Sequence, residues 1–234
     1  MDKIDEFFKK YKGGYFGIAA ALIGTIMIII AVILHSTAGP FNMFTHWISN
    51  LGIGPNGSMA VFNIGLIITV FAFTPFIIFM INFAWSEIEG KYIFVKKLLV
   101  IVTLIFAFLT LLGLFLVALF PMWPETIIMH FIGAMMFFLG SMFWTISMTV
   151  TLLLFREISI VQIAVTIGVV IVCSIFIGNI VFLMNTGGVT ADISNFMTIS
   201  GTPLWVRFWE WMYLFAILAY VFLTSIYILR YVEK

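Results

Sequence analysis

The sequence predicts an all-α membrane protein: a bundle of six transmembrane helices whose N- and C-termini are both cytoplasmic. Three observations predict this fold. First, 64% of the 234 residues are hydrophobic and only 9% are charged, whereas a soluble domain is about 25% charged. Second, six separate apolar runs reach the ~20 residues that a helix needs to cross a bilayer. Third, the basic residues concentrate on alternate connections between these runs.

The six runs cover residues 15–34, 59–85, 97–120, 127–155, 160–184 and 206–229. Each should be helical, because the bilayer interior offers backbone polar groups no water partner. No stretch between them is long enough for a separate soluble domain, so residues 1–234 are predicted to form one polytopic membrane domain. We therefore expect an integral, multi-pass protein of the cell membrane. The net charge of +1 gives no reason to expect a nucleic-acid partner.

The first run follows Lys9, Lys10 and Lys12, as the apolar part of a signal peptide would. It is longer than the ~7–15 residues typical of such a segment, which favours an uncleaved first helix. The connection 35–58 mixes aromatic and polar residues from Phe41 to Ile48, which predicts a short interfacial helix or a re-entrant cap there. Residues 121–126 predict a tight turn, and residues 185–205 a second long loop.

Ten of the eleven basic residues fall on one side of a six-span topology: Lys3, Lys9, Lys10, Lys12, Lys91, Lys96, Lys97, Arg156, Arg230 and Lys234. Only Arg207 falls on the other side. Loops rich in Lys and Arg stay in the cytoplasm, so both termini should be inside. An additional or missing helix would scatter these charges over both sides.

The outer side carries the residues that could do chemistry. All three histidines map there, with three acids and the remaining arginine: His35, His46, His130, Glu125, Asp192, Glu210 and Arg207. Glu210 lies about one turn into the last helix, where an unpaired carboxylate is expensive, and Arg207 precedes it by three residues on the same helical face. The two could form an ion pair that fixes the depth of the helix. Alternatively, Glu210 faces a polar cavity while Arg207 binds an anionic head group.

His130 begins the fourth span, where it is either a structural hydrogen-bonding residue or a group that binds ligand or transfers protons. His46 and Asn50 are four residues apart and would share one face of a short helix. The candidate catalytic residues are therefore His130 and Glu210. The candidate substrate-binding residues are Arg207, His46, Asn50 and Asp192.

No cofactor is predicted. Zinc takes three or four His, Cys or carboxylate ligands, and His35, His46 and His130 are the candidates if it binds. However, the sequence has no HExxH motif, and its single cysteine, Cys173, lies in the middle of a span. No charged residue lies at mid-depth in any span, which argues against an ion-coupled transporter.

Two short patterns carry a family resemblance: Ile48-Ser49-Asn50-Leu51-Gly52 with Pro55 and Phe62-Asn63-x-Gly65, and His130-x-x-Gly133-Ala134 with Phe137-Phe138. Together they resemble a prokaryotic six-helix membrane family known as domain of unknown function 998. That family is similar to the superfamily of damage-regulated autophagy modulators (DRAM) and GPI-lipid-remodelling proteins. The resemblance implies a lipid-linked function. In the family an acidic residue often stands at the position of Asn50, so an acid or metal-ligand role there is not carried over.

Two classes of function follow. The first is a protein that recognises or helps remodel lipid or glycolipid head groups at an outward-facing polar pocket, with membrane lipids as partners. The second is a membrane-embedded hydrolase or transferase that uses His130 and Glu210 in acid–base chemistry. A structural subunit with a protein partner, or a homo-oligomer, is a third alternative. The enzyme requires His130 and Glu210 at one cavity; the structural alternative predicts an Arg207–Glu210 pair.

Overall fold

The computed structural model describes residues 2–155, 159–185 and 204–231, and every regular element in these ranges is helical. The elements are α1 (Asp2–Lys10), α2 (Gly13–Ser36), the 3₁₀ helix η1 (Ile48–Ile53), α3 (Ser58–Ser86), α4 (Ile93–Leu119), α5 (Ile127–Phe155), α6 (Ile160–Asn185) and α8 (Leu204–Tyr231). Six of them, α2 to α6 and α8, are long and apolar enough to cross a membrane. Each predicted run lies on one of these six helices, which confirms the all-helical, multi-pass architecture.

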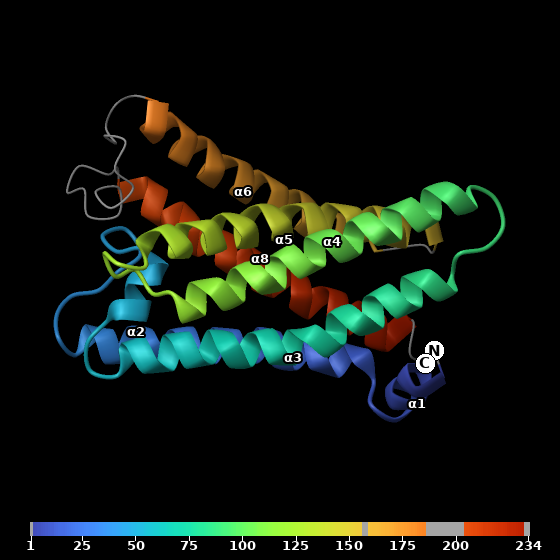
Figure 1. Cartoon of the computed structure of the whole chain (residues 1–234), viewed down its shortest axis with the longest axis horizontal. Coiled ribbons are helices and arrows are strands. Elements are labelled where there is room, and N and C mark those ends of the chain that lie inside the picture. The colour runs from blue at the N-terminus through green and yellow to red at the C-terminus, as the bar shows by residue number, and fades with distance from the viewer. Residues whose placement is uncertain (1, 156–158, 186–203, 232–234) are drawn as a thin grey trace.

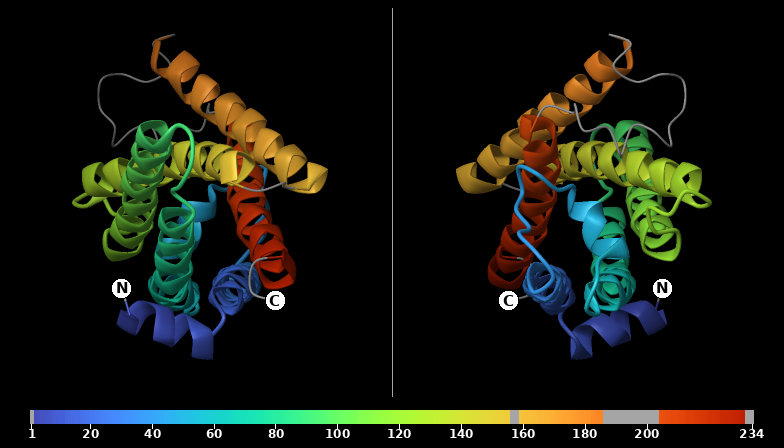
Figure 2. Two further views of the ribbon diagram at one scale, coloured as in Figure 1. Left: turned by 90° about the vertical axis from the view of Figure 1, so that its right-hand side faces the viewer. Right: turned by 90° about the vertical axis from the view of Figure 1, so that its left-hand side faces the viewer.

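The six long helices pack side by side in the order α2, α3, α4, α5, α6, α8, and α8 returns to α2 (Figures 1 and 2). Figure 2 looks along the bundle and shows α6 at its edge, beside α5 and α8. Because each helix contacts two neighbours, the interior is enclosed by side chains from all six helices. This interior holds the residues discussed below.

Small residues allow α2 to approach α3 and α8 closely, and α4 to approach α5. A Cβ atom at Gly17 of α2 would collide with Ser225 of α8 and Phe76 of α3. A Cβ at Gly113 of α4 would overlap the backbone of Gly133 and Phe137 in α5. Backbone contacts of this kind fix the register of α4 against α5, and with it the position of the first turns of α5.

The two ends of the bundle differ in charge and in covering. Both termini and the connection between α3 and α4 lie at one end (Figure 1), together with Lys91 and Lys96. Helix α1 lies across this end and packs Phe8 against Phe79, with 5.2 Å between the ring centroids. The opposite end, here called the η1 end, carries η1 and Arg207. This separation of charge agrees with the positive-inside rule, and cytoplasmic termini stay a prediction.

The long connection after α2 corrects one expectation. The helical segment lies at residues 48–53, not between Phe41 and Ile48, so His46 and Asn50 do not share a helical face. The side chains of Ile48, Ser49 and Leu51 are buried. Burial of this kind identifies η1 as a cap folded into the end of the bundle rather than a helix lying flat at the interface.

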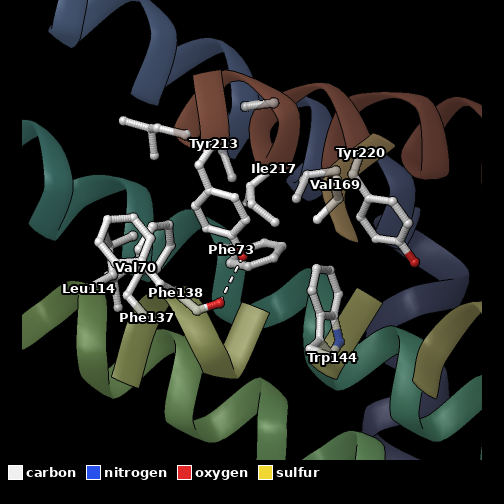
Figure 3. Packing of buried hydrophobic residues seen from close by; sticks show 14 of the residues in the cluster. Val70, Phe73, Leu114, Phe137, Phe138, Trp144, Val169, Tyr213, Ile217 and Tyr220 are labelled. Atoms are coloured by element: carbon white, nitrogen blue, oxygen red, sulfur yellow. Dashed lines mark hydrogen bonds between the residues drawn. The ribbon is translucent and has the colours of Figure 1, made fainter. Parts of the chain in front are cut away.

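Aromatic side chains from α3, α5 and α8 fill the centre of the bundle (Figure 3). Tyr213 of α8 donates a hydrogen bond from its hydroxyl to the Phe138 carbonyl of α5 at 2.8 Å. Between one and two turns further along α5, Trp144 packs edge to face against Tyr220, with ring centroids 5.4 Å apart. These contacts hold α8 against α5, the two helices that supply Glu210 and His130.

Candidate functional site

Three side chains in the second turn of α8 hold the connection between α2 and α3. Arg207 donates from Nη1 to the Thr45 carbonyl at 2.7 Å, and Trp211 donates from Nε1 to the His46 carbonyl at 3.0 Å. Between them, Glu210 accepts from the Ile48 backbone N–H at 2.8 Å. Residues three and four apart lie on the same face of a helix, so Arg207, Glu210 and Trp211, here called the α8 triplet, act together on one segment.

Glu210 is the buried member of the triplet, with 5% of its surface exposed. The first N–H groups of a helix lack partners within it, and the Glu210 carboxyl satisfies the one at Ile48 through Oε2. Its other oxygen, Oε1, accepts from the Ser49 hydroxyl at the longer distance of 3.4 Å. The carboxyl of α8 therefore caps η1, and its contact with Ser49 is weaker than its contact with Ile48.

The Arg207–Glu210 ion pair of the structural alternative does not form. The partners of Glu210 within the described residues are Ile48 and Ser49, and Arg207 binds the Thr45 carbonyl and lies 5.9 Å from the centre of the Trp47 ring. Asn50 is also used locally, because its Oδ1 accepts the Trp47 N–H at 2.8 Å and closes the first turn of η1. Arg207 and Asn50, two of the predicted substrate-binding residues, thus stabilise the cap.

His46 belongs to an aromatic cluster beside the cap. Its ring stacks on Phe41, with 4.5 Å between centroids, and Phe41 also contacts the ring of His35 at 4.3 Å. The Nδ1 atom of His46 pairs with the Thr45 hydroxyl at 2.8 Å. Burial lowers the pKa of His46 below its ordinary value of 6.5, and the nearby His35 and Arg207 lower this pKa further, because each disfavours a second positive charge.

His130 is fixed by a contact to the end of the preceding helix. The Nδ1 atom lies 2.8 Å from the Phe120 carbonyl, which closes the turn between α4 and α5. A carbonyl only accepts hydrogen bonds, so Nδ1 carries the hydrogen, and in the neutral ring Nε2 is then an acceptor. This arrangement orients the imidazole and leaves one nitrogen able to accept a proton or a hydrogen bond.

Two adjoining cavities have Glu210 and His130 in their walls. The first, here called the η1 cavity, has about 410 Å³ of space not filled by atoms, part of it open to the surroundings, and Ser49 is its third polar wall residue. The second, the α6 cavity, has about 310 Å³ of such space and extends between α5 and α6 past Phe131 and Phe176. The remaining walls of both are mainly apolar. The structure thus brings both predicted catalytic residues to one site.

The other predicted site residues fall elsewhere. Arg207, His46 and Asn50 do not line these two cavities, and Asp192 lies outside the described residues. Among residues 2–155, 159–185 and 204–231, no three His, Cys, Asp or Glu side chains are grouped as metal ligands. His35 and His46 do approach one another, with ring centroids 5.9 Å apart.

Sequence reasoning did not identify two features of this site. The hydrogen bonds from α8 to the backbone of residues 45–48 have no sequence signature, because the acceptors and donors are main-chain atoms. The position of Ser49 beside Glu210 depends on where η1 begins. The signal that was available lies in α8, where Arg207, Glu210 and Trp211 follow a helical spacing that predicts one polar patch.

Comparison of the chain with models of known protein families, with curated proteins and with solved structures finds no match to any of them.

Proposed function

We propose that this protein binds a lipid or related amphiphile at the η1 end of the bundle, with the polar group of the ligand at Glu210, His130 and Ser49. The observation that carries the proposal is the composition of the η1 cavity. Three polar side chains from three separate elements line this one cavity, and apolar side chains of η1, α3, α4, α5 and α8 form the remainder. Ligand sites of this kind use a few polar groups for orientation and apolar walls for affinity.

The polar wall favours a particular type of head group. Glu210 offers carboxyl oxygens, His130 offers Nε2, and the Ser49 hydroxyl both donates and accepts. Hydroxyl-bearing groups such as glycerol or sugar match this set, because they can donate to the Glu210 carboxyl, to His130 Nε2 and to the Ser49 oxygen. Arg207 lies on the cap rather than in the cavity wall, so recognition of an anionic group is not the favoured form of the proposal.

A lipid hydrolase or transferase is the second candidate. It is favoured by the presence of His130 and Glu210 in the walls of the same two cavities. In that reaction the His130 Nε2 atom would accept a proton from water or a substrate hydroxyl. Binding without turnover and binding with turnover share the same site and differ only in whether the bound lipid is chemically changed.

The test compares two Glu→Gln variants of the full chain. Glu210→Gln keeps the shape of the side chain and an acceptor for the Ile48 N–H, but removes the carboxylate. Glu125→Gln makes the same change at an exposed position in the turn before α5, at the same end of the bundle. We expect Glu210→Gln to lower the lipid that co-purifies in detergent, measured by native mass spectrometry, at least several-fold, and Glu125→Gln to retain it.

Equal lipid content in wild type, Glu210→Gln and Glu125→Gln would contradict the proposed site. His130→Asn provides a second variant, because the asparagine amide can still donate to the Phe120 carbonyl while the Nε2 acceptor is lost. Turnover is tested separately by incubating the purified protein with the extracted lipids and analysing the products.

A further inference from the structure

A third space, lined mainly by apolar side chains, adjoins the η1 cavity in the middle of the bundle. This mid-bundle cavity has about 490 Å³ of space not filled by atoms, part of it open to the surroundings, among α2, α3, α4, α5 and α8. It shares four wall residues with the η1 cavity: Leu66, Leu114, Phe137 and Leu214. Figure 3 shows Phe73, Leu114, Phe137 and Ile217 of its walls within the aromatic core. The polar site and the apolar space are thus adjacent compartments.

Water is a poor occupant of the mid-bundle cavity. Its only wall residues with side-chain polar atoms are Thr69 and Thr110. Both hydroxyls donate to carbonyls of their own helices, Thr69 to Gly65 at 2.8 Å and Thr110 to Phe106 at 2.7 Å. A buried water needs two to four polar partners, and no donor here lacks one. The chemistry of the walls therefore selects hydrocarbon.

The geometry of α8 links the two compartments. One face of α8 carries Glu210, Leu214, Ile217 and Val221 at helical spacing. Glu210 lines the η1 cavity, and Val221 is the α8 wall residue of the mid-bundle cavity that lies furthest from it along the helix. At about 1.5 Å per residue, Glu210 and Val221 are roughly 16 Å apart along the axis. The hydrocarbon part of one leaflet is about half of the ~30 Å hydrocarbon core. The axial distance from Glu210 to Val221 is therefore similar to the length of one lipid chain.

We propose that the mid-bundle cavity receives one hydrocarbon chain of the ligand whose polar group lies at Glu210, and that residues at its far end set the chain length. This inference rests on the proposed function and specifies its substrate class as an amphiphile with one chain inserted between the helices. Small side chains on α2, Ala20, Ala21 and Gly24, leave the space that the chain fills. Val221 is the wall residue of α8 that lies furthest along the helix from Glu210.

The test changes the far end of the cavity in two directions. The full chain in detergent is mixed with equal amounts of monoacylglycerols of graded chain length, and the bound species are identified by native mass spectrometry. We expect Val221→Phe to shift the preferred ligand to shorter chains and Val221→Ala to shift it to longer ones. Val181→Phe, at a position 49% exposed on α6, is the matched control and should keep the wild-type preference.

Opposite shifts at one position cannot arise from a general loss of folding, and Val221→Ala serves alone if Val221→Phe does not fold. An unchanged chain-length preference in a folded Val221 variant, with binding still lowered by Glu210→Gln, would overturn this inference and leave the proposed function standing. Binding of the monoacylglycerols that is insensitive to Glu210→Gln would overturn the proposed function instead.

Discussion

At the scale of single residues, the site depends on hydrogen bonds that its members make to main-chain atoms. Glu210 accepts from the backbone of Ile48, and His130 binds the carbonyl of Phe120. Each side chain therefore has one atom committed to the fold and also lines the two cavities. A substitution can remove either role, and the choice of replacement decides which role is tested.

Glu210→Ala should destabilise the protein, whereas Glu210→Gln should not. Alanine leaves the buried Ile48 N–H and Ser49 hydroxyl without their acceptor, and an unsatisfied buried donor costs about 1–3 kcal/mol. Glutamine retains an acceptor oxygen in the same place. Thermal unfolding of both variants in detergent measures the difference. An alanine variant as stable as wild type would show that the carboxyl does not support η1.

His46 should make stability depend on pH. Its pKa is lower in the folded protein than the ordinary 6.5, so between the two values the unfolded chain binds more protons. The contribution of His46 to the free energy of unfolding is therefore fully present above pH 6.5, and it is lost as the pH drops through the pKa of the folded state. Between about pH 7.5 and about pH 5.5, the melting temperature should fall less in His46→Gln than in wild type. Parallel curves for the two proteins would rule out this contribution.

At the scale of elements, α8 and η1 form one functional unit although they are far apart in sequence. The α8 triplet reaches the backbone of residues 45–48, and this contact closes the end of the bundle above the η1 cavity. The length of the apolar runs predicted each of the six long helices, because hydrophobic length is a local property of the chain. The position of η1 was not predicted, because it is decided by contacts with α8 that local sequence does not encode.

Loss of one triplet hydrogen bond should loosen the cap without unfolding the bundle. Trp211→Phe removes the indole N–H that binds the His46 carbonyl while keeping an aromatic ring. Hydrogen exchange of residues 41–53 should become faster, and exchange in α3 and α4 should not change. Trp205→Phe, an exposed position one to two turns earlier on α8, is the control. Unchanged exchange in Trp211→Phe would show that the cap is held by other contacts.

The α4–α5 pair should tolerate no side chain at its crossing. Gly113→Ala places a methyl group against the α5 backbone, and such overpacking costs about 1–3 kcal/mol. Gly168→Ala makes the same change on α6, where a Cβ would meet nothing within 4 Å. The temperature of thermal unfolding should therefore be lowered by Gly113→Ala and be unchanged or raised by Gly168→Ala. Equal effects would contradict the close packing of α4 on α5.

At the scale of the whole molecule, the chain separates its functions along one axis. Of the described basic residues, all but Arg207 lie at the end that holds both termini, and the cap, the polar site and its cavities lie at the other end (Figure 1). This partition was predictable, because charge counts on loops and hydrophobic length require no tertiary information. The convergence of Glu210 and His130 could only be proposed, because sequence does not state how six helices are arranged around an interior.

The orientation of the molecule can be measured with single cysteines. Cys173 is buried, so it should contribute little background to labelling of intact cells. We expect a membrane-impermeant maleimide to label Gly39→Cys, in the exposed connection before the cap, in intact cells. Lys91→Cys, between α3 and α4, should be labelled only after the membrane is opened. The reverse pattern would place the polar site on the cytoplasmic side.

The most direct test of the central claim is an electron-density map of the full chain in a lipid nanodisc. The account predicts non-protein density that begins beside Glu210, His130 and Ser49 and continues as a narrow tube toward Val221. Well-resolved side chains around an empty space, with lipid density confined to the outer surface of the helices, would contradict it.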